Sequence, residues 1–194
     1  MSRPSPFGVI SFPHTHTPRS PSPGADERYS VSIIFDKAAQ ETEEFKEMKS
    51  EAMRVATEKW GAKAADMIKS GQLRMPFRPA EEKAKYAGYE AGKVFVNAWS
   101  KQAPDVIDGR LNDVAASDVF PGCVGRITYN PFAYDNSGNK GVSIGLNNLQ
   151  ISDFSTPRLD GKKKGHDDFG DALDVPDMPD SPQEGVPVDD DLPF

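Results

Sequence analysis

The sequence predicts a mainly β fold of the α+β class: a small barrel or sandwich that carries a helical insertion and is followed by an acidic tail. Several segments alternate apolar and polar residues over the length of a strand. One long segment between two of those strands repeats its apolar residues at helical spacing instead. Strands of uneven length that are interrupted by one helical section favour a barrel or sandwich over a regular βαβ alternation.

The clearest predicted strand is 27–35, where serines occupy one face and the other face holds Tyr29, Val31, Ile33 and Phe35. Residues 93–100 alternate in the same way. Turn-forming residues at 135–141 predict a hairpin that joins the two strands on either side of them. The hairpin strands and the shorter strand candidates lie at 123–132, 141–151, 9–12 and 104–108, the last as a short hairpin partner. The proline- and serine-rich segment 14–24 is predicted to be a loop.

A helical insertion is predicted over about 37–69. Asp36 is a suitable N-cap, and Gly61 ends the longer helix. Between them, lysines and glutamates separate apolar residues that recur at helical spacing: Phe45, Met48, Ala52, Val55, Ala56 and Trp60. A shorter helix is expected at 62–69. Because the section lies between predicted strands, we expect it to pack on one side of the sheet.

The acidic charge of the chain is concentrated at its C-terminal end. The formal net charge is −7, but ten of the 30 acidic residues and none of the 23 basic ones lie after Lys164. The sequence therefore predicts a domain at 1–164 with a slight positive excess and a disordered tail at 165–194. The tail ends in three carboxylates, Asp189, Asp190 and Asp191. They are followed by an apolar plug of three residues with the terminal carboxylate, Leu192, Pro193 and Phe194. It is either a solubilising tail or a recognition tail that a small apolar pocket with a basic neighbour captures.

The same composition excludes several classes of protein. Cys123 is the single cysteine, so an intramolecular disulfide and a thiolate-rich metal site are ruled out, which fits a reducing compartment. No run is long and apolar enough to span a membrane, and no secretory signal is present, so a cytoplasmic location without a membrane partner is expected. His14, His16 and His166 all lie in predicted irregular segments. With no assembled acid–base or nucleophile set, we expect neither an enzyme nor a bound metal or cofactor.

Two faces combine flat rings with cations, as single-strand binding requires. The first lies on the strand at 93–100 and comprises Phe95, Trp99 and Lys101, with Lys93 at its start. The second lies on the predicted hairpin and comprises Arg126, Phe132 and Tyr134, with Lys140 at the turn. Each has a simpler interpretation, since Phe95 and Trp99 would also suit an ordinary core under the helices and the hairpin tip a solvated loop.

The end of the chain, Asp-Asp-Asp-Leu-Pro-Phe, resembles the tail of bacterial single-stranded-DNA-binding proteins. The body resembles a phage family of single-stranded-DNA-binding proteins that was long catalogued as a domain of unknown function. The run GNKGVSIGLNN at 138–148 carries most of this second resemblance. It is supported by further matches in the same order: 9–13, 29–34, 96–98, Lys101, Pro104, Asp108, Gly122, Cys123 and Arg126.

The resemblance implies a five-stranded OB-fold barrel, a phage-encoded protein in a bacterial host cell, and DNA binding without sequence preference. The expected role is protection of single strands during replication or recombination, with the tail recruiting partner proteins. The residues expected to contact DNA are Lys93, Phe95, Trp99, Lys101, Arg126, Phe132, Tyr134 and Lys140. Two alternatives stay open: a general binder of duplex DNA or RNA, and a protein-interaction or virion module. Self-association is likewise left open.

Overall fold

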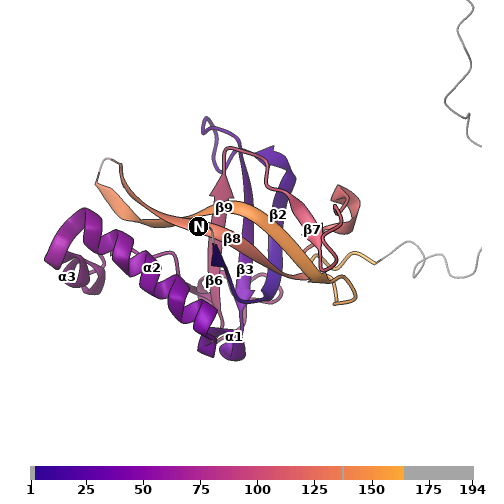
Figure 1. Cartoon of the computed structure of the whole chain (residues 1–194), viewed down its shortest axis with the longest axis horizontal. Helices are drawn as coiled ribbons and strands as arrows, with labels where there is room; N and C mark the ends of the chain where they lie inside the picture. The colour runs from indigo at the N-terminus through magenta and orange to yellow at the C-terminus, as the bar shows by residue number, and fades with distance from the viewer. Residues whose placement is uncertain (1–2, 137, 164–194) are drawn as a thin grey trace, which may run out of the picture. The chain divides into compact units, whose positions relative to one another are not determined.

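The computed structural model describes residues 3–136 and 138–163. The chain divides into two units, Met1–Lys162 and Lys163–Phe194, and the expected tail at 165–194 lies outside the described residues. The first unit is mainly β sheet, and its longest helix follows the third strand along the chain (Figure 1). This confirms the predicted mainly β class with inserted helices.

One sheet contains all the strands of the described residues. They are β1 (Arg3–Pro4), β2 (Gly8–Arg19), β3 (Arg28–Phe35), β4 (Leu73–Arg74), β5 (Arg78–Pro79), β6 (Val94–Ser100), β7 (Val106–Asp108), β8 (Val124–Asn136) and β9 (Asn139–Asp153). The pairings run β8–β2–β3–β6–β9 and return to β8, so five strands form a closed ring. Only the β6–β9 pairing in this ring is parallel.

Two glycines face each other where β2 pairs with β8, and each also lies close to the next strand of the ring, β3 or β9. Gly8 and Gly125 are register partners. A Cβ at Gly8 would lie 2.6 Å from the Ile34 carbonyl oxygen, and one at Gly125 would lie 2.6 Å from the Gln150 carbonyl oxygen. Real Cβ atoms do not approach backbone oxygens so closely, so larger residues would force the strands apart.

Two predicted segments differ from the observed ones. Strand β2 continues to Arg19, through half of the segment predicted to be a loop, because register shifts between Ser11 and His14 and between His14 and Arg19 accommodate its prolines. The short strand β7 was expected as a hairpin partner. It makes a local antiparallel bridge between Ile107 and Asp113, and it also pairs in parallel with β9. The pairing with β9 joins residues distant in sequence, which local turn signals do not reveal.

The helical insertion consists of α1 (Lys37–Glu41), α2 (Glu43–Trp60) and α3 (Ala64–Lys69), with a 3-10 turn at Gly61–Lys63. The Asp36 side chain caps α1 by accepting a 2.8 Å bond from the Ala39 N–H, as predicted. Thr42 ends α1 and caps α2, which splits the predicted single helix in two. None of the described helices has the length and apolar character that crossing a membrane requires.

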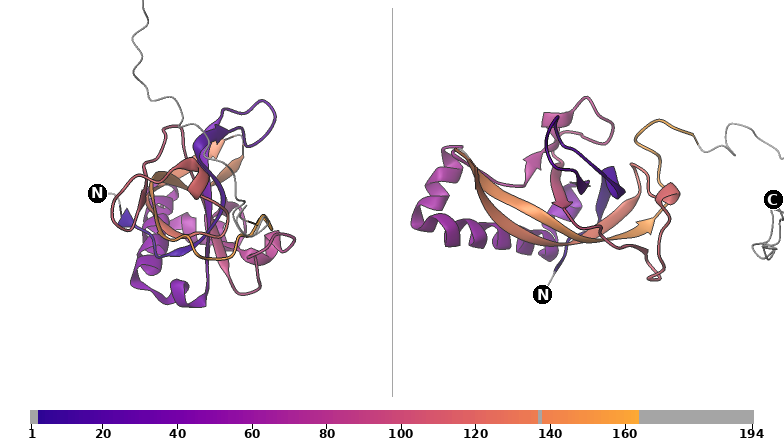
Figure 2. Two further views of the ribbon diagram at one scale, coloured as in Figure 1. Left: turned by 90° about the vertical axis from the view of Figure 1, so that its right-hand side faces the viewer. Right: turned by 90° about the horizontal axis from the view of Figure 1, so that it is seen from above.

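The core has two main parts. The larger lies inside the ring and is built from buried side chains of its strands and of α2, among them Ile10, Ile33, Phe35, Phe45, Val96, Ile144 and Leu149. The smaller joins α2 and α3 to β4 and β9 through Ala52, Ala56, Ala64, Leu73 and Val142. The β8–β9 hairpin extends past the ring, and the helices lie along its extended part (Figure 2). The helical insertion thus supports this extended part of the β8–β9 hairpin, which is called the arm below.

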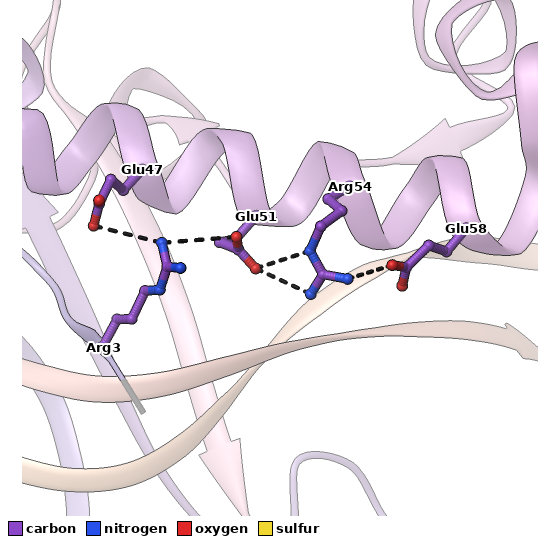
Figure 3. A network of polar contacts seen from close by, with 5 residues as sticks. All are labelled: Arg3, Glu47, Glu51, Arg54 and Glu58. Atoms are coloured by element: carbon purple, nitrogen blue, oxygen red, sulfur yellow. Dashed lines mark hydrogen bonds and ion pairs between the residues drawn. The ribbon is translucent and has the colours of Figure 1, made fainter. Parts of the chain in front are cut away.

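A chain of ion pairs links β1 to α2 (Figure 3). The Arg3 guanidinium lies 3.7 Å from a carboxylate oxygen of Glu47 and 3.7 Å from one of Glu51. Arg54 continues the chain by pairing with Glu51 at 3.0 Å and with Glu58. Because most of these side chains are largely exposed, each pair contributes at most about 1 kcal/mol, and the network aligns β1 rather than holding the fold together.

Tyr129, on β8 beside this network, buries a hydroxyl that has no hydrogen-bond partner among the described residues. Burial, aided by Glu47 and Glu51 against the opposing effect of Arg3, raises the pKa of Tyr129 to about 12. An unfolded tyrosine ionises near pH 10, so stability that is complete below pH 10 should be lost progressively as the pH rises to 12.

Tyr129→Phe removes the unpaired hydroxyl, and the free energy of unfolding at pH 7 is therefore expected to stay level or to rise by about 1 kcal/mol. The loss of stability at alkaline pH that comes from Tyr129 should disappear in this variant. Urea denaturation at pH 7, 10 and 11 measures both effects, with the exposed Tyr86→Phe as the matched control. A clear destabilisation at pH 7 would show that the hydroxyl is satisfied in solution.

Candidate nucleic-acid interface

The outward face of β3, β6, β9 and the β8 arm brings together residues from distant parts of the sequence. On β9 the outward positions are the small residues Gly141, Ser143 and Gly145, which alternate with buried apolar residues. Phe132 of β8 is the register partner of Ser143, and Trp99 of β6 is the partner of Gly145. The small β9 side chains leave room for the large rings of the two neighbouring strands.

Trp99 is held in one orientation on this face. Its indole Nε1–H donates a 3.0 Å hydrogen bond to the Ser143 hydroxyl. The Phe132 ring packs edge-on against it, with the centroids 5.3 Å apart, and the Arg28 guanidinium lies 4.7 Å from its ring centre. Burial lowers the pKa of Arg28. The half-buried indole is thus a fixed aromatic surface that already accommodates a cation.

A groove of about 630 Å³ lies beside Trp99, between the sheet face and the segment that follows α3. Its polar lining includes Arg74 and Arg78 from the short strands β4 and β5, Asn97 from β6, and Tyr134 and Ser143 from the arm. Strand β4 pairs with β9 at Lys140 and Gly141, which fixes this wall against the arm. Arg78 is paired with Glu82, with Nε 2.8 Å from Oε2. Two arginines with a tyrosine and an amide suit phosphate and base contacts.

The structure brings together three of the predicted rings. Trp99 and Phe132 are in contact, and Tyr134 lines the adjoining groove. Lys140 lies on the same arm and pairs with Asp135 at 3.4 Å. Lys101 is exposed one residue beyond β6 and pairs with Asp26 at 2.8 Å.

Two predicted cations lie elsewhere, beside Phe7. The Arg126 guanidinium lies 4.7 Å from the Phe7 ring centre and donates a 2.9 Å bond to Gln150. Lys93 lines a small cavity with Phe7 and pairs with Glu90 at 3.0 Å. Neither lines the groove or contacts Trp99 in the structure.

Phe95 does not offer a stacking surface, contrary to the sequence-based expectation. Its side chain is 0% exposed and packs with Ile34, Ala80 and Tyr89. The alternation of β6 was assigned correctly, but the segment after β5 covers this end of the outward face. The simpler interpretation, an ordinary core residue, therefore applies to Phe95 and not to Trp99.

Sequence reasoning missed three cations of this site: Arg28, which lies against Trp99, and Arg74 and Arg78, which line the groove. Arg74 and Arg78 flank a proline-rich stretch with no periodicity, which indicates only a loop. Arg28 begins a predicted strand, and its position against Trp99 follows from the β3–β6 pairing, which no local signal specifies. Among the described residues no three histidine, cysteine, aspartate or glutamate side chains are placed to hold a metal ion.

Five strands form a closed ring, and its outward face carries aromatic side chains, arginines and a groove. These features define the protein as a candidate for nucleic-acid binding by a β sheet. The chain belongs to the family described as the single-stranded-DNA-binding protein of Enterobacter phage Enc34, whose model matches residues 9–179. It is thus a member of a phage single-stranded-DNA-binding protein family. No curated protein sequence matches the chain.

Solved structures show the same fold at low sequence identity. The single-stranded-DNA-binding protein of bacteriophage Enc34, in complex with single-stranded DNA, matches with a TM-score of 0.60 at 16% identity, over 76% of this chain and 84% of that one. Its C-terminal truncation matches with 0.63 at 15% identity, over 79% and 86%. The gp2.5 protein, a single-stranded-DNA-binding protein encoded by bacteriophage T7, matches with 0.59 at 12% identity, over 84% and 97%.

Proposed function

We propose that this protein binds single-stranded DNA without sequence preference and protects it during phage DNA replication or recombination. The observation that carries the proposal is the fixed Trp99 ring beside the arginine-lined groove. Bases of any identity have a flat face that can stack on Trp99 and Phe132, while Arg74 and Arg78 neutralise phosphates. Family membership and the DNA-bound Enc34 structure support the same conclusion.

We also infer that the ring of β2, β3, β6, β8 and β9 is a five-stranded OB-fold barrel. Its closed pairings and its likeness to phage single-stranded-DNA-binding proteins support this assignment. In such a barrel one sheet face and the flanking loops carry the nucleic acid, which is the side that Trp99 and the groove occupy. Binding of this kind needs no catalytic group, so the protein acts as a binder rather than an enzyme.

Tryptophan fluorescence tests the function directly. The chain has two tryptophans, so Trp60→Phe leaves Trp99 as the single probe. Oligo-dT is expected to quench it, and log K should fall linearly with log salt, by roughly 0.7 per phosphate contact. Duplex DNA and RNA of equal length serve as competitors, and oligo-dA and oligo-dC test sequence preference. Absence of salt-dependent binding would favour a protein-interaction module, and equal competition by duplex or RNA a general nucleic-acid binder.

The acidic tail is proposed to have two roles. Its ten acidic groups, tethered to the domain, compete with DNA for the cationic groove. Its end, from Asp189 to Phe194, recruits replication or recombination proteins through the apolar plug and the free carboxylate. Both roles rest on the tail's sequence, since these residues lie outside the described part of the chain.

A chain truncated after Lys164 is expected to bind oligo-dT more tightly at low salt, because a competing polyanion has been removed. At about 1 M salt, where the Debye length is about 3 Å, the gain should vanish. The matched control is the full chain with Leu192→Ala and Phe194→Ala, which keeps every tail carboxylate and should bind DNA like the unaltered protein. Equal low-salt affinities of truncated and full chains would contradict the competition.

A further inference from the structure

A second aromatic cluster lies on β2 and the segment after β5, outside the groove. Its central residue is Phe12, a non-glycine residue in the left-handed region with φ +46°. A phenylalanine in this conformation is strained and persists only where its surroundings impose it. The strained backbone turns the ring outward, where it stays 37% exposed. Its neighbour Tyr86 is 41% exposed, and the two rings meet edge-to-face with centroids 5.1 Å apart.

Two lysines accompany these rings. The Lys83 ammonium lies 5.0 Å from the centre of Phe12 and 5.3 Å from that of Tyr89. The Lys85 ammonium lies 5.0 Å from the centre of Tyr86. Exposed rings with cations at their faces are the combination that holds single-stranded nucleic acid, in which a base stacks and its phosphate is neutralised nearby. The charge complements a polyanion rather than an apolar protein surface.

The cluster is continuous with the groove through Lys83 and Arg78. Both cations lie against the covered ring of Phe95, Lys83 at 4.6 Å and Arg78 at 5.2 Å from its centre. Arg78 also lines the groove. Phe95 and Trp99 lie four residues apart on the same face of β6, so their Cα atoms are about 13 Å apart at the usual rise of ~3.3 Å per residue. Arg78 and Lys83 therefore connect the groove to the exposed rings.

We propose that Phe12 and Tyr86, with Lys83 and Lys85, form a second stacking platform for bases of the same DNA strand that lies over Trp99. The proposal rests on the proposed function and extends it. A strand long enough to follow β6 engages both places, whereas a short one is held at the groove alone. The strain at Phe12 is then the cost of presenting a ring to DNA rather than to the core.

Phe12→Asn and Tyr86→Ser together test the platform. Asparagine accepts a positive φ better than phenylalanine, so the double variant should keep its melting temperature while losing both rings. Oligo-dT of about 5 and about 15 nucleotides, within the ~4–16 nucleotides that one OB fold covers, is measured by fluorescence anisotropy. The ratio of the long to the short affinity is expected to fall at least about fivefold, the low end for one stacked ring.

Trp99→Ala, in a parallel titration, separates this proposal from the proposed function. It should weaken the binding of both lengths, because both use the groove. If Trp99→Ala has no effect while the ratio still falls in the double variant, the platform stands and the groove is wrong. If the ratio is unchanged in the double variant at an unaltered melting temperature, the platform is overturned, and the exposed rings then serve a partner other than DNA.

Discussion

Replacement of Trp99 by alanine is expected to weaken the binding of single-stranded DNA by about 5- to 150-fold. One ring stacked on a base contributes ~1–3 kcal/mol, and ~1.4 kcal/mol corresponds to a tenfold change in affinity. The full effect is expected because Ser143, Phe132 and Arg28 already fix the indole, so DNA does not have to order it. Anisotropy titration with oligo-dT at constant salt measures the loss.

Three further variants test whether the loss of affinity in Trp99→Ala comes from the missing ring. Trp99→Phe keeps a stacking ring and should recover part of the affinity. Ser143→Ala keeps the indole but removes its 3.0 Å hydrogen bond, so it should cost less than Trp99→Ala. The exposed Leu111→Ala, on the loop after β7, removes an apolar side chain away from the groove and should change nothing. An unaltered affinity of Trp99→Ala, with an unaltered melting temperature, would remove Trp99 from the site.

Replacement of Arg74 and Arg78 by glutamine is expected to reduce the salt dependence of binding. Each phosphate contact contributes about 0.7 to the slope of log K against log salt for a single strand, so the slope should fall by up to about 1.4. The affinity should drop strongly at low salt and little at high salt, where released counterions no longer favour binding. Arg78 must exchange Glu82 for a phosphate when DNA binds, so its share is expected to be the smaller one.

The matched control is a double variant that loses the same two positive charges at positions away from the groove. Lys59 on α2 and Arg110 after β7 are exposed and line no part of the groove. Lys59→Gln with Arg110→Gln should weaken binding slightly through net charge while leaving the slope nearly unchanged. Equal changes of slope in the two double variants would mean that overall charge, rather than the groove, governs the contact with DNA.

Periodicity and turn chemistry predicted much of the fold. The alternation in β3 and β6, the β8–β9 hairpin and the helical section were all found, because these signals lie within a few neighbouring residues. The parallel pairings of β4, β6 and β7 with β9 were not predicted. They join residues distant in sequence and depend on the closure of the ring, which no local pattern encodes.

The residues of the candidate site were likewise predicted where local signals specify them and missed where they do not. Trp99, Phe132 and Tyr134 were predicted from the faces of their strands, and the structure places them together. Phe95 shares the face of Trp99 but is covered, because burial there depends on the segment after β5. Arg74 and Arg78 were missed since irregular, proline-rich sequence gives no indication of the direction in which its side chains point.

The pairing of β4 with β9 has a consequence for the energetics of the whole insertion. Strand β4 follows directly from α3, and its Leu73 is buried with Ala52, Ala56 and Ala64 of the helices. A ligand in the groove contacts Arg74 and thus binds only the state in which the helices are docked. By mass action, DNA is then expected to stabilise the helical insertion against local unfolding, although only Ile68 of α3 among the residues of α1 to α3 lines the groove. Hydrogen exchange of the α2 and α3 amides should slow on DNA binding, so α2, which lines no part of the groove, becomes a reporter of the occupied groove.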